Sequence, residues 1–261
     1  RQLKQWNKSI RRAVEVSSRA RDLDVYIHFL NRYAGKTKGI PERWVLVSFI
    51  VALKKKREKL QPRIIRALED LNKRGTLEDI TRSLGRALAA DRLLPQGASR
   101  PSGGKMENNP RKIYKVARKK LLGRLRELMV FEPFVYQPRR VQELHQMRIA
   151  AKHLRYTLEG FASIYGPRLP LFIERVVSFH RQLGDIHDYD VWTQHLARYA
   201  RVRSRSRHEE AVLNKVKRHC LGLRQKTYRA FVRNWSRARA AGRLPAGGKF
   251  FEDLMEYVYA H

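Results

Sequence analysis

Four nitrogen-bearing side chains stand at helical spacing in the second half of the chain: His145, Arg148, Lys152 and Arg155. At about 100° per residue they fall within about 80° of one another, so on a helix they form one ridge. Successive cations would lie about 4.5 to 6 Å apart along the axis, a spacing that suits consecutive phosphates of one polymer. Arg can hold a phosphate through two donors, Lys acts as a mobile point charge, and His adds a further donor. The ridge therefore predicts polyanion binding and implies no reading of bases.

The same segment has an apolar side and an acidic end. Glu159 lies on the ridge four residues after Arg155, so we expect it to pair with Arg155 or Lys152 and to mark the end of the anion track. The arc beside the ridge is apolar and is predicted to face the core; it holds Met147, Ala151, Leu154, Leu158 and Phe161.

A run of Lys and Arg on one helix is, by itself, typical of a solvated face, and a single His is more often a core or capping residue. Further ridges favour a ligand instead. One consists of Lys112, Lys115, Lys119 and Arg126. Another consists of Lys215, Arg218, Lys226, Arg229, Arg233 and Arg237. Several positively charged ridges without opposing Glu repel one another and are unfavourable on a protein surface unless an anionic ligand binds them.

The composition also indicates a polyanionic partner. The 261 residues include 57 Lys plus Arg against 24 Asp plus Glu, a formal net charge of +33. Such a surplus repels itself and weakens the compact state unless anions neutralise it. Nucleic acid, an anionic membrane surface and inorganic polyphosphate all qualify as partners at this point.

Cysteine content and hydropathy bear on the compartment. Cys220 is the one cysteine of the sequence, which excludes an internal disulfide framework and a Cys-rich zinc site; its spacing predicts a small core residue. The longest apolar run, residues 44–53, is about half of what a membrane span needs. We expect a cytoplasmic protein.

The first residues have the pattern of a helix interior, without an initiator Met or signal peptide, so we expect the sequence to begin inside a longer gene product.

Apolar residues recur at three- and four-residue spacing along nearly the whole chain, and period-two alternation is absent, which predicts an all-α fold. Residues 96–110 are rich in Gly, Ser, Pro and Asn and are predicted to form a flexible linker between a first helical half, 1–95, and a second, 111–261. We expect helices over residues 3–33, 42–59, 62–74, 77–93, 111–130, 140–165, 168–183, 188–203, 207–240 and 250–259.

The two halves repeat a short motif. Residues 21–25 read RDLDV and residues 187–191 read HDYDV, an offset of 166 residues, and both copies follow and open amphipathic helices. This context favours a duplication, so we expect two pseudo-symmetric helical bundles of the four-helix type.

Two roles are open for the aspartates of that motif, Asp22 with Asp24 and Asp188 with Asp190. They could hold magnesium in an enzyme that acts on polyphosphate. However, residues two apart point about 200° from each other on a helix, so each pair converges only at a helix end. The structural role is preferred: one Asp caps or begins a helix and the other pairs with a ridge Arg. We expect no catalysis, no metal and no cofactor.

At these residues the sequence resembles the CHAD domain family, the conserved histidine α-helical domain. The second half carries His145-x-x-Arg148-x-x-x-Lys152-x-x-Arg155-Tyr156, then Glu159, then Gln182-Leu183-Gly184-x-x-His187-Asp188. The first half supplies Arg19-x-Arg21-Asp22-Leu23-Asp24-Val25. The family's first half also carries its own His-x-x-Arg helix; none is found here, so we expect the first bundle to lack its first helix and to hold its part of the site incompletely.

The resemblance implies two related four-helix bundles that bind inorganic polyphosphate, here as a stand-alone module without a CYTH-like triphosphate-processing segment, and association with polyphosphate granules. Non-specific binding of nucleic acid is the alternative, although no zinc finger, RNP motif, basic zipper or aromatic stacking platform is visible. The candidate polyphosphate ligands are His145, Arg148, Lys152, Arg155, Tyr156, Arg19, Arg21, Arg57, Lys112, Lys115, Lys119, Arg126, His187, Lys226, Arg229 and Arg233.

Overall fold

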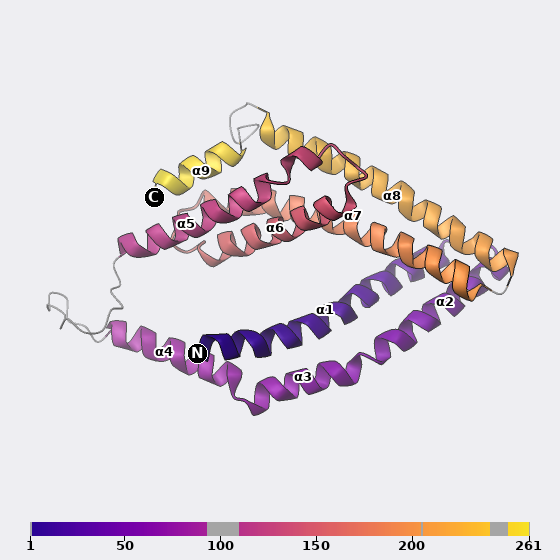
Figure 1. Ribbon diagram of the computed structural model, residues 1–261, viewed down its shortest axis with the longest axis horizontal. Coiled ribbons are helices and arrows are strands. Elements are labelled where there is room, and N and C mark those ends of the chain that lie inside the picture. The colour runs from indigo at the N-terminus through magenta and orange to yellow at the C-terminus, as the bar shows by residue number, and fades with distance from the viewer. Residues whose placement is uncertain (1, 93–109, 205, 241–249, 261) are drawn as a thin grey trace. The chain divides into compact units, whose positions relative to one another are not determined.

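The computed structural model describes residues 2–92, 110–204, 206–240 and 250–260, and within these ranges it holds helices and no strand. The predicted all-α class is confirmed. The predicted linker lies outside the described residues except for Pro110, which opens a helix. The elements in Figure 1 are α1 (Gln2–Gly35), α2 (Ile40–Glu58), α3 (Gln61–Lys73), α4 (Thr76–Arg92), α5 (Pro110–Met129), the 3-10 turn η1 (Glu132–Phe134), α6 (Val141–Gly160), α7 (Leu169–Arg203), α8 (Arg207–Arg239) and α9 (Phe250–Ala260).

No helix in the described ranges is both long enough and apolar enough to cross a membrane. The expected burial of Cys220 is also confirmed, because its side chain has no exposed surface.

One predicted break is wrong. Residues 168–183 and 188–203 were expected as separate helices, but α7 runs through Gly184 without interruption. A glycine inside a helix costs about 1 kcal/mol relative to alanine. Leu183 and Ile186 on either side are each 1% exposed, and this continuous buried stripe outweighs the local cost.

The continuity of α7 changes the reading of the aspartate motif. Asp188 and Asp190 lie inside α7, and Asp22 and Asp24 lie inside α1. The expectation that one Asp of each pair caps or begins a helix is therefore wrong.

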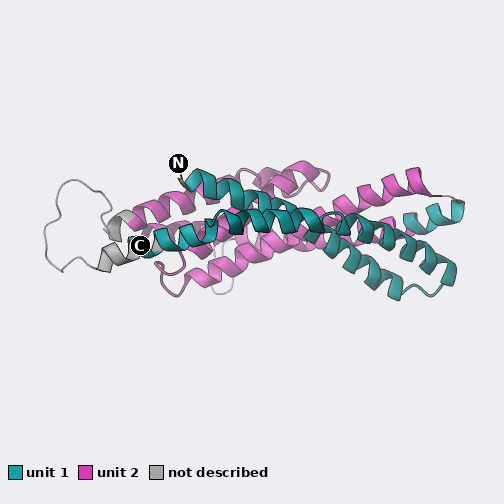
Figure 2. Cartoon of the chain, turned by 90° about the horizontal axis from the view of Figure 1, so that it is seen from below, with its two compact units in different colours: residues 1–106, 205–213 teal, residues 107–204, 214–261 magenta. Residues whose placement is uncertain are grey.

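The chain divides into two compact units, shown in Figure 2. The first contains α1 to α4 and also residues 207–213 at the start of α8. The second contains α5, η1, α6, α7, the rest of α8, and α9. The division expected from the sequence, at residues 96–110, differs in that it assigned all of α8 to the second half.

Aromatic residues form the centre of the second unit. Phe179 of α7 lies 5.1 Å from Trp235 of α8 and 6.1 Å from Phe251 of α9, measured between ring centroids, and all three are buried. Pairs at such distances and tilts add about 0.5–1.5 kcal/mol each beyond the burial of their area. This packing holds α7 in place, and α6 packs against α7 (Figure 1).

The expected duplication is visible in a repeated ion pair. In the first unit the Nε of Arg57 on α2 donates to both carboxylate oxygens of Asp24 on α1, at 3.0 and 3.1 Å. In the second unit Arg224 on α8 donates to Asp190 on α7 at 2.6 and 3.2 Å. The aspartates are 166 residues apart and the arginines 167, so α1 corresponds to α7 and α2 to the first part of α8.

This correspondence leaves α5 and α6, which precede α7, without counterparts in the described part of the first unit.

Candidate functional site

The ridge of α6 sits at the edge of a buried helix face, as its periodicity predicts. Met147, Ala151, Leu154 and Leu158 have no exposed surface, and Phe161 packs partly buried against the same core. His145, Arg148, Lys152 and Arg155 are each half-buried. The core therefore fixes the backbone below the four ridge side chains and limits their freedom.

The facing wall of the ridge is α7. The Nδ1 atoms of His145 and His187 lie 3.0 Å apart, and the two ring centroids lie 4.3 Å apart. Only one of two neutral rings can donate across this contact, so one carries its proton on Nδ1 and the other accepts there. Burial, the proximity of His145 and the charge of Arg148 lower the pKa of His187 to about 4. Burial and Arg148 also lower the pKa of His145.

Arg148 lies against the backbone of α7 at Gly184. A Cβ atom built on Gly184 would be 3.8 Å from the Arg148 Nε, an ordinary van der Waals contact, so a methyl group fits there. That Nε is buried, and among the residues that the structure describes it has no hydrogen-bond acceptor. The Arg148 guanidinium therefore lies beside the α7 backbone at Gly184, with space for a methyl group between them.

A third histidine, His180, joins this cluster from α7. Burial lowers its pKa to about 4, and the charges of Arg148, Arg155 and Lys152 act in the same direction, whereas Glu159 opposes them. Burial and the three nearby ridge cations together therefore favour the neutral form of His180.

Sequence reasoning missed His180 because it ended a helix at residue 183. On the continuous α7, positions 180, 184 and 187 fall on one face at i, i+4 and i+7, and that spacing was the available signal. We refer to His145, Arg148, Lys152, Arg155, His180 and His187 as the α6–α7 site.

The C-terminal end of the ridge is closed by an acid and an aromatic ring. The Arg155 Nε donates to Glu159 at 2.7 Å, which confirms the predicted pairing. The Lys152 Nζ and the Arg155 guanidinium lie 5.7 and 5.6 Å from the centroid of the Tyr156 ring. Tyr156 is 52% exposed, so it holds two cations at the border with solvent.

The candidates of the first unit are placed differently. Arg57 is engaged by Asp24, as described above, and Arg19 donates to Glu15 at 2.7 Å. Arg21 is exposed on α1, at the position that corresponds to His187 in the repeat. Arg57 therefore has a structural partner, which the sequence-based assignment as a ligand did not foresee.

The remaining candidates are spread over two helices of the second unit. On α5 the exposed cations are Lys115, Lys119 and Arg126. On α8 they are Lys226, Arg229 and Arg233. Lys112 lies in α5, and its side chain is outside the described part of the structure. The six exposed cations of α5 and α8 are solvated, whereas the residues of the α6–α7 site are half-buried.

The described ranges contain no group of three or more His, Cys, Asp or Glu side chains arranged to hold a metal ion. The carboxylates of Asp24 and Asp190, considered above as magnesium ligands, accept hydrogen bonds from arginines instead.

Comparison with known proteins gives one match. The family model described as "CHAD domain" matches residues 1–197, which include α6 and nearly all of α7. A search of curated proteins finds no match.

Proposed function

This chain belongs to the CHAD domain family, and from that membership together with the α6–α7 site we propose that it binds inorganic polyphosphate. The family is associated with polyphosphate binding, and a net charge of +33 suits a polymer with one negative charge on each closely spaced phosphate. The proposal includes association with polyphosphate granules, and it is for binding without turnover.

The observation that carries the proposal is the position of three ridge cations near His180, whose neutral form is favoured by burial. Burial lowers the pKa of His180 most, and Arg148, Arg155 and Lys152 lower it further, whereas Glu159 opposes them, so the three cations all lie within electrostatic reach of this one histidine. Like charges held this close destabilise the fold, and a polyanion along the ridge reverses the sign of that interaction.

The burial of Arg148 adds to this support. Its buried Nε–H group has no acceptor among the described residues, and an unsatisfied donor of this kind costs about 1–3 kcal/mol. A phosphate oxygen is an acceptor that an arginine can bind through two parallel hydrogen bonds. The exposed cations of α5 and α8 would add a salt-dependent contribution without a fixed geometry.

Binding of long-chain polyphosphate to the wild type and to R148A/K152A/R155A tests the proposal, by calorimetry with competing duplex DNA at physiological salt. We expect the wild type to keep polyphosphate in the presence of excess DNA, and the triple variant to lose at least about a hundredfold in affinity, since each charge-assisted contact contributes about 1.5–3 kcal/mol. Both should have the same far-UV circular dichroism.

K54A/K55A/K56A is the matched control, because it also removes three cations, all exposed and all on α2. If both triple variants lose the same affinity, net charge binds the polymer and the α6–α7 site has no special role. Equal affinity for duplex DNA would favour the nucleic-acid alternative, and release of orthophosphate with Mg²⁺ would show an enzyme.

A further inference from the structure

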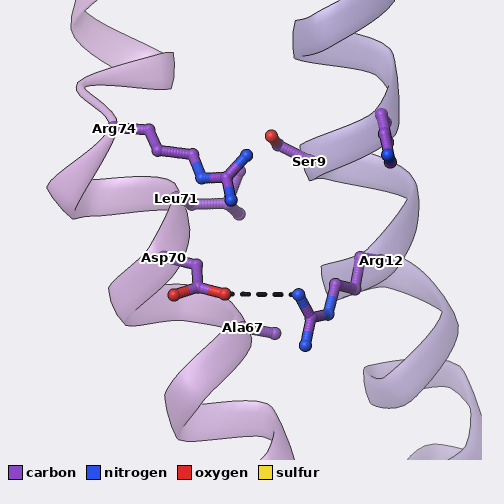
Figure 3. A pocket seen from close by; sticks show the side chains of 7 residues that line it. Ser9, Arg12, Ala67, Asp70, Leu71 and Arg74 are labelled. Carbon is purple, nitrogen blue, oxygen red and sulfur yellow. Dashed lines mark hydrogen bonds and ion pairs between the residues drawn. The ribbon is translucent and has the colours of Figure 1, made fainter.

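The first unit contains a small pocket between α1 and α3, apart from the α6–α7 site. Figure 3 shows it from close by, with Arg74, the residue directly after α3, reaching toward Ser9 on α1. The cavity has a volume of about 170 Å³, and its cations are Lys8, Arg12 and Arg74. From these residues we infer a second anion site, which binds one phosphate-sized oxyanion.

The charges and donors around the pocket suit that ligand. Lys8, Arg12 and Arg74 bring three positive charges against the single carboxylate of Asp70, and Ser9 adds a hydroxyl donor. The guanidinium groups of Arg12 on α1 and of Arg74 at the end of α3 can each present a pair of N–H donors to a tetrahedral oxyanion.

The carboxylate does not block the pocket. Arg12 and Asp70 pair at 3.4 Å with 68% and 45% of their side chains exposed, and such exposed pairs are weak. The side of the pocket against the core is apolar, since Ala67 and Leu71 are buried and pack with Ala13. A low-dielectric wall strengthens the attraction between the cations and an anion placed beside it.

The second unit shows what closes the equivalent space there. The repeat offsets place Ser9, Arg12 and Ala67 at the positions of Arg175, Ser178 and Asn234. The single offset of 167 covers α3 as well as α2, because residues 40–73 form a nearly continuous helical run that corresponds to α8 at 207–239.

In the second unit these three residues bond to one another. Arg175 donates to the Asn234 amide oxygen at 3.0 Å, and the amide nitrogen donates to Ser178 at 3.0 Å and to Gln182 at 3.1 Å. Asn234 therefore occupies the gap between α7 and α8. With Ala67 at this position, the gap between α1 and α3 stays open and is lined by cations instead.

The test is a titration with inorganic orthophosphate, followed by the arginine Nε–H resonances in NMR and run at constant ionic strength. The parent protein is the full chain carrying R148A/K152A/R155A, so that failure of the proposed polyphosphate site does not affect the outcome. We expect saturable shifts of the Arg12 and Arg74 resonances, assigned from single lysine variants.

Two variants, A67N and D70N, test whether the pocket itself binds phosphate. A67N introduces the side chain that closes the equivalent gap and is expected to lower phosphate affinity at least about tenfold without removing a cation, because close-packed interiors leave no room for both. D70N is expected to tighten binding about fivefold, the effect of one unit charge at about 4 Å in water.

D22N removes the same charge from a position on α1 that does not line the pocket, and it controls for net charge. Since unfolding cannot raise affinity, the D70N result stands even if A67N folds poorly. The inference is overturned if the shifts do not saturate, if a folded A67N titrates like its parent, or if D70N and D22N have the same effect.

Discussion

The two aspartate–arginine pairs of the repeat differ in burial, and this difference predicts unequal costs when each is broken. Asp190 and Arg224 each have 13% of the side chain exposed, whereas Asp24 and Arg57 have 54% and 26%. Arg224 also donates to the carbonyl oxygen of Pro138 at 2.9 Å. The change D190A therefore leaves a largely buried guanidinium with one neutral acceptor.

The magnitudes follow from that environment. Breaking a buried pair by removing one partner costs about 3–5 kcal/mol, and the pair at Asp190 keeps slight exposure, so we expect about 3 kcal/mol for D190A. An exposed pair contributes about 0.2–1 kcal/mol, so we expect less than about 1 kcal/mol for D24A. Replacing Arg224 by methionine in the D190A background removes the stranded charge and should recover part of the loss.

Urea unfolding of the full chain, followed by far-UV circular dichroism at pH 7, measures these differences. Equal losses for D190A and D24A, or no recovery in D190A/R224M, would refute the reasoning. The same proteins also separate structure from chemistry. A folded D190A should bind polyphosphate like the wild type. Loss of binding in a folded D190A would show that Asp190 contributes to the binding site.

Three further outcomes are expected. A bound polyanion should raise the pKa of His180 and His187 from about 4, so that binding takes up protons. The affinity measured by calorimetry should therefore rise as the pH falls from 7 toward 5, by up to about tenfold per pH unit for each proton. H180Q/H187Q should flatten this dependence of affinity on pH. G184L should displace Arg148 and weaken polyphosphate binding about tenfold, whereas G184A, whose methyl group fits, should bind normally in the same titration. Cys220 is buried and its pKa is raised to about 12, so Ellman's reagent should label it only in denaturant.

The part of the site that lies on one helix could be predicted from the sequence. The 3.6-residue period fixes the ridge of α6, its buried side and the pairing of Arg155 with Glu159, because all three depend on one helix alone. The pairing of His145 with His187 depends on packing between helices, and periodicity does not give it.

Two features of the structure could not be predicted, for specific reasons. His180 was missed because Gly184 and the aspartates after it were taken to end a helix, although local propensity yields to a continuous buried stripe. The ion pair of Arg57 with Asp24 was not foreseen because the sequence around Arg57 does not show the carboxylate that α1 brings to it; its role as a ligand stays a prediction. In both cases the deciding contact comes from a second helix.

The two repeats share a frame but differ in chemistry. Both keep the aspartate–arginine pair that ties one long helix to the next, and this pair needs only two residues whose spacing the duplication preserved. At the positions of His180, Gly184 and His187 the first unit carries Val14, Ser18 and Arg21. Arg21 can hold an anion but cannot release a proton near pH 7, and Val14 can do neither. If the polymer binds as proposed, we expect the proton-linked response to come from the second unit, and H180Q/H187Q should reduce the pH dependence while the first unit stays intact.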